Sequence, residues 1–228
     1  MPRLSLVLYV LAAALLCLAP LLLATPLPPS LESNFSELLR QGQVPNLVAT
    51  VILHTRLYDT VAEVVVFTLA SIGVRWIFQG EARQRRVMAL EDAPSVVLCQ
   101  LGATACAMVA VELALRGHLS PGGGFAAGVA GGTAIGLLLI SGSARLADRL
   151  YRRYRADLWE KGAVLIFLLV AWLVLEGVLE GGALGGGARF GAIASGGWIP
   201  LLNGLVALKV TLGSWAMVQL LVRYRGLF

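Results

Sequence analysis

The chain has 228 residues, of which 58% are hydrophobic and only 14% are charged, and its formal net charge is +5. A soluble domain needs about a quarter of its residues charged to cover its surface, so this composition excludes a protein that water surrounds on all sides. The basic balance would suggest a nucleic-acid partner on a soluble protein. Here the Lys and Arg residues flank apolar runs, as membrane topology requires, so we exclude nucleic acid.

Apolar runs long enough to cross a bilayer, which takes about 20 residues, predict an all-α integral membrane protein with about six transmembrane helices. The first run, residues 4–24, is expected to be a retained helix, and a cleaved signal peptide is the alternative. The other five spans are expected at about residues 60–78, 95–115, 124–140, 162–179 and 198–222.

The segments between these runs are polar, glycine-rich or too short to cross. Residues 25–46 are expected to form a loop with a short helix that begins at Ser33. Residues 47–53 are apolar but too short to span, so we expect extended or re-entrant backbone packed on protein. The remaining connections are two solvated basic linkers and one glycine-rich loop, at residues 79–93, 143–161 and 181–197.

The distribution of basic residues predicts the orientation of the chain. Most of the 18 Lys and Arg residues fall on one side if both termini are cytoplasmic, which agrees with an even number of spans. We therefore expect a multi-pass protein of the cell membrane whose N- and C-termini are cytoplasmic, with the lipid bilayer as its main surroundings.

A glycine pattern follows the turn at residues 117–123, where Pro121 stops a helix and glycines permit positive φ angles. Glycines then recur every four residues and lie on one face of the expected helix: Gly124, Gly128, Gly132 and Gly136. A face without side chains lets another helix approach closely in lipid, so these four are predicted to pack helices together.

Ionisable residues inside the expected spans are candidates for an ion or proton pathway, because a charge is costly there. Asp59 and Glu63 lie four residues apart on one helical face, where two carboxylates could hold a proton or Na⁺. Lys209 lies in the middle of the last span with no partner nearby in the sequence. Such an ammonium must pair with a carboxylate, reach water or lose its proton.

Other candidates lie near the outer ends of the spans and have simpler interpretations. Glu112, Glu176 and Glu180 are pathway candidates, or carboxylates in water at the outer interface. His118 is a proton-relay candidate, or a structural histidine of the turn. Asp59 could equally form a local ion pair with Arg56.

The sequence holds no motif of a catalytic, metal or cofactor site. It has no phosphate-binding loop, no HExxH and no nucleophile elbow. Cys17, Cys99 and Cys106 lie in apolar runs and form no CxxC pair, so we expect no disulfide and no metal. We therefore expect neither an enzyme nor a bound cofactor.

Two stretches resemble subunits of one family. Residues 46–63 resemble the C-terminal part of the large A subunit of Mrp-type multisubunit cation/proton antiporters, and the equivalent small subunit of membrane-bound hydrogenases. The matching residues there are Arg56, Tyr58, Asp59, Thr60 and Glu63. The string at residues 117–125 resembles the B subunit of the same antiporters, which has four helices.

The resemblance implies a fusion of two parts, residues 1–93 like the A-subunit tail and residues 94–228 like a B subunit. It implies a membrane subunit that supports Na⁺/H⁺ exchange beside other subunits, with Glu63 on the ion pathway. The alternatives are a subunit of the membrane arm of a hydrogenase or complex I-like redox enzyme, or a purely structural assembly subunit. A stand-alone transporter is disfavoured because the six runs show no inverted repeat.

Overall fold

The computed structural model describes residues 30–81, 89–179 and 189–225. The chain divides into two compact units, residues 1–36 and 37–228. Of the first unit only the beginning of helix α2 (Ser30–Gly42) is described, so everything below concerns the second unit.

Five helices of the second unit are long and apolar enough to cross a membrane. They are α4 (Leu57–Ile77), α5 (Ala93–Arg116), α6 (Gly124–Leu138), α8 (Ala156–Leu175) and α9 (Ile199–Arg225). No strand occurs in the described ranges. The prediction of a multi-pass all-α membrane protein is therefore confirmed, and the expected span at residues 4–24 lies outside the described residues.

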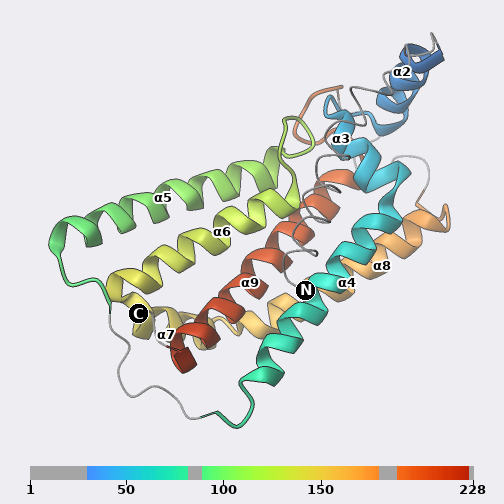
Figure 1. Ribbon diagram of the computed structural model, residues 1–228. Helices are drawn as coiled ribbons and strands as arrows, with labels where there is room; N and C mark the ends of the chain where they lie inside the picture. Colours follow the sequence, from blue (N-terminus) through green and yellow to red (C-terminus); the bar gives the residue numbers. More distant parts are fainter. Residues whose placement is uncertain (1–29, 82–88, 180–188, 226–228) are drawn as a thin grey trace, which may run out of the picture. The chain divides into compact units, whose positions relative to one another are not determined.

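Helix α9 is the centre of the unit, because it contacts each of the other four spanning helices. Figure 1 shows α6 on one side of α9 and α4 on the other, with α5 beyond α6. Buried apolar side chains fill the space between α4, α8 and α9, among them Val64, Phe167, Leu202 and Val206. Their burial fixes the helices that carry the polar site described below.

The contact between α6 and α9 depends on glycines. A Cβ atom at Gly124 would lie 2.5 Å from the Asn203 carbonyl oxygen, and one at Gly132 would lie 2.6 Å from Ser214 Cβ. Gly128 faces Val210 at similarly close range. Gly136 is the exception among the four predicted packing glycines, since a Cβ there would meet no atom within 4 Å.

Two segments that were expected to be irregular are helical. Residues 47–53, expected to be extended or re-entrant backbone, form a short helix α3 (Leu47–Thr50) and most of a π-helical turn (Val51–Thr55) that leads into α4. The Arg56 amide donates to the Val51 carbonyl five residues back, as a π turn requires. The carbonyl of Ile52 accepts from the Thr60 hydroxyl at 2.7 Å.

The basic linker at residues 143–161 was also predicted wrongly. Residues 144–153 form the strongly amphipathic helix α7 (Ala144–Arg153), and α8 begins at Ala156 rather than at residue 162. We call the end of the helix bundle that carries α7 the α7 end, and the opposite end, with the 117–123 turn, the His118 end. The first turns of α8, at the α7 end, contain polar residues, and these residues had suggested a solvated linker.

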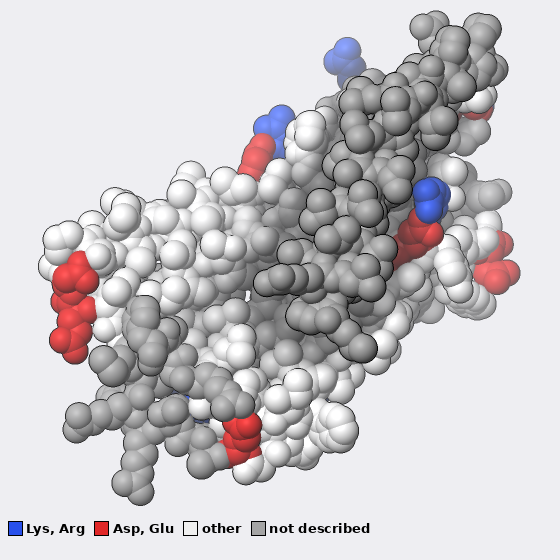
Figure 2. All heavy atoms as spheres, viewed as in Figure 1, with Lys and Arg blue, Asp and Glu red and all other residues white. Residues whose placement is uncertain are grey.

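The surface of the bundle separates charged from apolar side chains. Helix α5 carries two charged residues, Glu112 and Arg116, both in its last two turns. Figure 2 shows the described surface over α5 as almost uncharged, with charged side chains gathered towards its ends. Exposed apolar residues of this kind are expected where a helix faces lipid or another membrane subunit.

Candidate functional site

An ion pair lies inside the bundle between α8 and α9. The Lys209 Nζ atom is 2.6 Å from Glu160 Oε1, and the two side chains are only 2% and 5% exposed. Lys209 lies about 15 Å along α9 from Ile199, at 1.5 Å per residue, so its position is within the span. The sequence left three possibilities for this ammonium: to pair with a carboxylate, to reach water or to lose its proton. The structure shows the first.

Arg75 on α4 completes the cluster. Its Nη2 atom lies 3.0 Å from Glu160 Oε2, so each oxygen of the carboxylate has its own cationic donor. The cluster of Arg75, Glu160 and Lys209, which we call the ion triad, therefore carries one positive charge in excess. Arg75 is 36% exposed, whereas the other two members are enclosed.

The surroundings of Lys209 suit an ammonium group. The ring of Phe67 lies 5.5 Å from Nζ, within the range of a cation–π interaction. Gly213 leaves room for this ring and for the carboxylate, because a Cβ there would lie 2.7 Å from Phe67 Cε1 and 3.3 Å from Glu160 Oε1. A side chain at position 213 would therefore press on the triad.

A buried hydroxyl lies on the same face of α4. Ser71 is 2% exposed, and its Oγ atom has no hydrogen-bond partner among the described residues. It is four residues from both Phe67 and Arg75, so the three share one helical face towards the triad. A buried hydroxyl usually has a partner, and a water molecule next to the triad would supply one.

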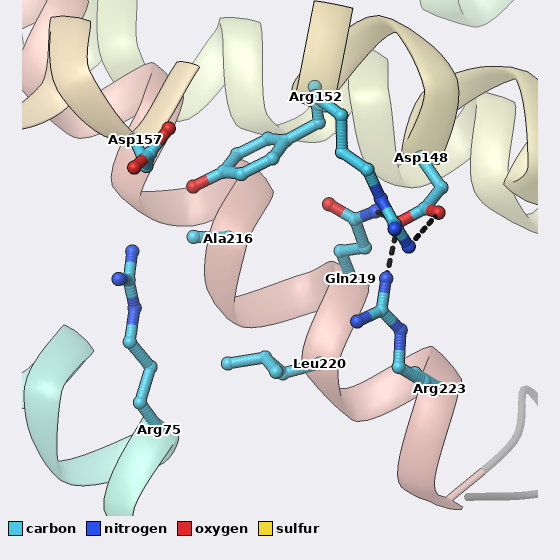
Figure 3. A pocket seen from close by; sticks show the side chains of 9 residues that line it. Arg75, Asp148, Arg152, Asp157, Ala216, Gln219, Leu220 and Arg223 are labelled. Atoms are coloured by element: carbon cyan, nitrogen blue, oxygen red, sulfur yellow. Dashed lines mark hydrogen bonds and ion pairs between the residues drawn. The ribbon is translucent and has the colours of Figure 1, made fainter. Parts of the chain in front are cut away.

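A cavity of about 370 Å³ leads from the α7 end to the triad. Figure 3 shows Arg75 on one side of this cavity and Arg152, Asp148 and Arg223 on the other. Because Arg75 lines the cavity and also binds Glu160, it links the cavity to the buried carboxylate. The space admits several water molecules, each of which takes about 30 Å³ in the liquid.

Tyr151 of α7 also lines the cavity. Burial raises the pKa of its phenol, while the positive charge of Arg75 and a hydrogen bond with it lower that pKa, and the carboxylates of Glu160 and Asp157 raise it. The phenol thus lies within the electrostatic field of the triad. Its ring stacks edge-on against Trp215 at 5.3 Å between centroids, which fixes α7 on α9.

Asp148 holds α7 to the end of α9. Its carboxylate accepts hydrogen bonds from Arg223 and Gln219 of α9, with Gln219 Nε2 at 2.6 Å, and from Arg152 of its own helix. Figure 3 shows Arg152 and Arg223 meeting at this carboxylate. Two arginines therefore share one carboxylate, as two cations share Glu160.

The His118 end holds a second buried polar group. His118 is fully buried, and neither ring nitrogen has a hydrogen-bond partner within the described ranges. Burial lowers the pKa of its imidazole, and the backbone of Ile193 and Ala192 partly opposes this effect. The turn is fixed by Asn46, whose amide donates to the carbonyls of Gly117 and Ser120, both at 2.7 Å.

The predicted carboxylates of α4 lie away from the triad. Asp59 and Glu63 are both exposed on the outer surface of α4, whereas the triad lies towards α8 and α9. Asp59 forms an ion pair with Arg56, as the simpler interpretation expected. The structure therefore does not bring Glu63 together with Lys209.

The remaining predicted carboxylates also lie at the surface. Glu112 pairs with Arg116 four residues on, at 2.9 Å, with both side chains more than half exposed. Glu176 is exposed just after the end of α8, and its expected neighbour Glu180 lies outside the described residues. Cys99 and Cys106 are free thiols on α5, and Cys17 lies outside the described ranges.

Sequence reasoning missed Glu160, the central member of the triad. It was assigned to the basic linker at residues 143–161, whose arginines suggested a solvated segment. A helical pattern would have found it, because Glu160 shares the buried face of α8 with Ala156, Ala163 and Phe167. A carboxylate in that pattern is expected to meet a cation.

Two comparisons find proteins that are similar to this chain, and a third finds none. A model of the family described as "domain related to MnhB subunit of Na+/H+ antiporter" matches residues 94–216. No curated protein matches the sequence. The fold is similar to that of a chain in the membrane-bound sulfane sulfur reductase, an archaeal respiratory membrane complex, with a TM-score of 0.71 and 21% identity over 98% of this chain and 99% of that one.

The family match covers more than half of the sequence and includes α5, α6, α8 and most of α9. The structural match covers nearly the whole chain, so it extends beyond the residues that the family model matches. This chain is a multi-pass membrane protein and belongs to the family of domains related to the MnhB subunit of Na⁺/H⁺ antiporters.

Proposed function

We propose that this chain is a non-catalytic subunit of a multisubunit membrane complex and supports the exchange of Na⁺ for H⁺ through its ion triad. The family supplies the general role. The observation that carries the proposal for this chain is the buried Glu160–Lys209 pair, which the cavity at the α7 end approaches through Arg75.

The charge count of the triad suggests which group handles the proton. Two cations share one carboxylate, and an uncompensated charge inside a membrane protein is costly. An arginine keeps its proton in proteins, whereas a lysine can release one. Release of the Lys209 proton would leave Arg75 and Glu160 as a balanced pair, so Lys209 is the proposed proton carrier.

The cavity gives this step a route to water. Protons would enter or leave at the α7 end, which the distribution of basic residues predicts to be the cytoplasmic side. From there they would pass Tyr151 and Arg75 to reach Glu160 and Lys209. The unpartnered Ser71 hydroxyl supports a water molecule beside the triad.

The exposed carboxylates of α4 fit a different part of the same role. Glu63 lies on the outer surface of a spanning helix, where lipid alone would leave its charge without compensation. We propose that this surface meets a neighbouring subunit, which supplies a donor or shares a bound Na⁺ with Glu63. Asp59 is partly satisfied by Arg56 already.

A second candidate role is a subunit in the membrane arm of a redox-driven complex. The whole-chain fold likeness to a subunit of a respiratory reductase favours it. The two roles differ in the driving force and in the partners. Iron–sulfur or other redox subunits that co-purify with the tagged chain would select the second role, and antiporter subunits alone would select the first.

The proposal is tested by Glu160→Gln in the assembled complex, with Na⁺-driven proton movement measured in everted membrane vesicles. We expect assembly to persist and exchange to be lost. Lys161→Met is the matched control, because Lys161 is the exposed neighbour of Glu160 and is expected to leave exchange unchanged. Normal exchange by the Glu160→Gln complex would overturn the proposed role of the triad.

A further inference from the structure

Two cavities lie next to each other at the α7 end. The first is the 370 Å³ cavity of Figure 3, and the second, of about 440 Å³, lies between α4 and the end of α9. Both are lined by Arg75 and Leu220, so they adjoin across these two side chains. We call the first cavity the polar half and the second the apolar half of this pair, after the side chains that line them.

Among the residues that the structure describes, the second cavity has Arg75 as its one charged lining residue, whereas five charged residues line the first. It is lined by Ile72 and Trp76 of α4, which are 56% and 75% exposed, and by Tyr224 of α9. Tyr224 stacks on Phe78, another lining residue, with the ring centroids 5.2 Å apart. This half runs along α4 from Gly80 at the α7 end to Ile72, about two helical turns deeper.

The first cavity offers guanidinium groups for an anion. Arg75, Arg152 and Arg223 line it, and so do two carboxylates, Asp148 and Asp157. Each guanidinium has five N–H donors, of which the ion pairs to Asp148 and Glu160 use only some. Arg152 is 66% exposed, so its remaining donors are open to a ligand.

The charge balance around this cavity favours an anion. Four cations, the three arginines and Lys209, face three carboxylates: Asp148, Asp157 and Glu160. Exposed arginines nearby add further positive charge: Arg149 and Arg153 of α7, and Arg155 between α7 and α8. A phosphate group suits such a site, because guanidinium groups bind phosphate with paired hydrogen bonds.

The level of the two cavities in the bilayer is suited to a lipid. Trp76 and Tyr224 lie at the ends of spanning helices, where amphipathic aromatic side chains occupy the headgroup level of a bilayer. A phosphate in the polar half would then lie at the level of the lipid headgroups. The apolar half extends along α4 towards the middle of the bilayer, the level at which lipid acyl chains lie.

We propose that the two cavities together bind one anionic phospholipid. Arg152, Arg223 and Arg75 bind its phosphate, and one acyl chain lies in the groove beside Ile72 and Trp76. Because Arg75 also binds Glu160, one guanidinium then contacts both the bound phosphate and the carboxylate of the triad. The lipid site is therefore directly coupled to the ion triad.

The test measures which phospholipids stay with the complex after it is purified in mild detergent and washed. Mass spectrometry of the intact complex, supplied with phosphatidylglycerol or phosphatidylcholine, reports the bound lipid. We expect the unmodified complex to retain phosphatidylglycerol and not phosphatidylcholine. The double variant Arg152→Gln/Arg223→Gln loses this lipid, and Arg116→Gln, an exposed arginine at the His118 end, retains it.

A second pair of variants tests the apolar half without touching the arginines. Ile72→Trp fills the groove, whereas Leu69→Trp changes a similarly exposed position on α4 that lines neither cavity. We expect loss of phosphatidylglycerol with the first and retention with the second. Both positions are exposed, so these variants are expected to fold even if the arginine double variant does not.

Three outcomes would overturn the proposal. The first is equal retention of phosphatidylglycerol and phosphatidylcholine, and the second is retention of phosphatidylglycerol by the Ile72→Trp complex. The third is that a photoreactive residue placed at position 72 crosslinks to another subunit and to no lipid. That result would assign the groove to a protein partner.

Discussion

The Lys209 ammonium binds the Glu160 carboxylate at 2.6 Å, although 49 residues separate the two in the chain and both are buried. The pair joins α8 to α9, and Arg75 of α4 binds the other oxygen of the same carboxylate. Three helices therefore meet at one carboxylate, which makes Glu160 both a structural junction and the candidate element of an ion pathway.

Glu160→Gln should destabilise the complex more than Lys209→Met. The first change leaves two cations without a counter-ion, at a cost of about 3–5 kcal/mol for a broken buried pair. The second leaves the Arg75–Glu160 pair intact and places an apolar side chain beside Phe67. The double variant should recover part of the loss, because only the half-exposed Arg75 then lacks its partner.

The measurement is the apparent unfolding temperature of the purified complex in detergent for the two single variants and the double variant. If Glu160→Gln and Lys209→Met lowered it equally, and the double variant lowered it by their sum, the residues would not form a coupled pair.

Gly128→Ala and Gly136→Ala should have opposite effects on stability. A Cβ at position 128 presses on the Val210 side chain and lies 3.1 Å from the Ala207 carbonyl oxygen, and such overpacking costs about 1–3 kcal/mol. A Cβ at position 136 meets nothing within 4 Å, so the higher helix propensity of Ala should add about 0.5–1 kcal/mol. Thermal unfolding of the two complexes compares them, and equal losses would place a partner subunit against Gly136.

Acidification should weaken the His118 end. Burial lowers the pKa of His118 in the folded chain, so below about pH 6.5, the ordinary histidine value, the unfolded chain binds more protons. Stability should be unaffected by this group above that pH and should fall below it, by at most about 1.4 kcal/mol for each pH unit.

Unfolding temperatures measured at a series of pH values test this expectation. His118→Gln should flatten the acidic part of the profile, whereas His54→Gln, at an exposed position, should leave it unchanged. A profile that stays the same after His118→Gln would mean that another group causes the pH dependence.

Glu63→Gln should reduce exchange without preventing assembly. If a neighbouring subunit or a bound Na⁺ shares this carboxylate, loss of its charge removes an interaction of about 1.5–3 kcal/mol, which is about tenfold or more in rate or affinity. Exchange in everted vesicles and co-purification of partner subunits are the two readouts. Glu91→Gln, at another exposed position, is the control, and unchanged exchange in Glu63→Gln would favour a structural role for α4.

Hydropathy was enough to predict the spans that face lipid. Helix α5 was expected at residues 95–115 and occupies Ala93–Arg116, and α4 was expected at 60–78 and occupies Leu57–Ile77. These helices are apolar around most of their circumference, so a window of about 20 residues finds them without knowledge of their neighbours.

The beginning of α8 could not be found in this way, because its charges are neutralised by distant residues. Glu160 lowers the hydropathy of its window, yet Arg75 and Lys209 from two other helices compensate its charge inside the bundle. Helix α7 was missed for another reason. Its arginines suggested a solvated linker, although Leu146 and Leu150 lie four residues apart between them, which is a helical spacing.

The sequence predicted one member of the triad, Lys209, but not its partner Glu160. Lys209 stood out as a buried ammonium that needs a partner, but nothing near it in the chain identified Glu160. The motif at residues 117–125 pointed to the correct family, while the partner of Lys209 required the packing of α8 on α9.

The most direct test of the central claim is ion exchange by the assembled complex with Lys209→Arg. Arginine keeps the positive charge beside Glu160 but does not release its proton. If Lys209 carries the proton, the complex should assemble and exchange should fall by about a hundredfold or more, the usual scale for loss of a positioned proton donor. Exchange at the unmodified rate would show that only the charge at position 209 is needed, and would contradict a proton-carrying role.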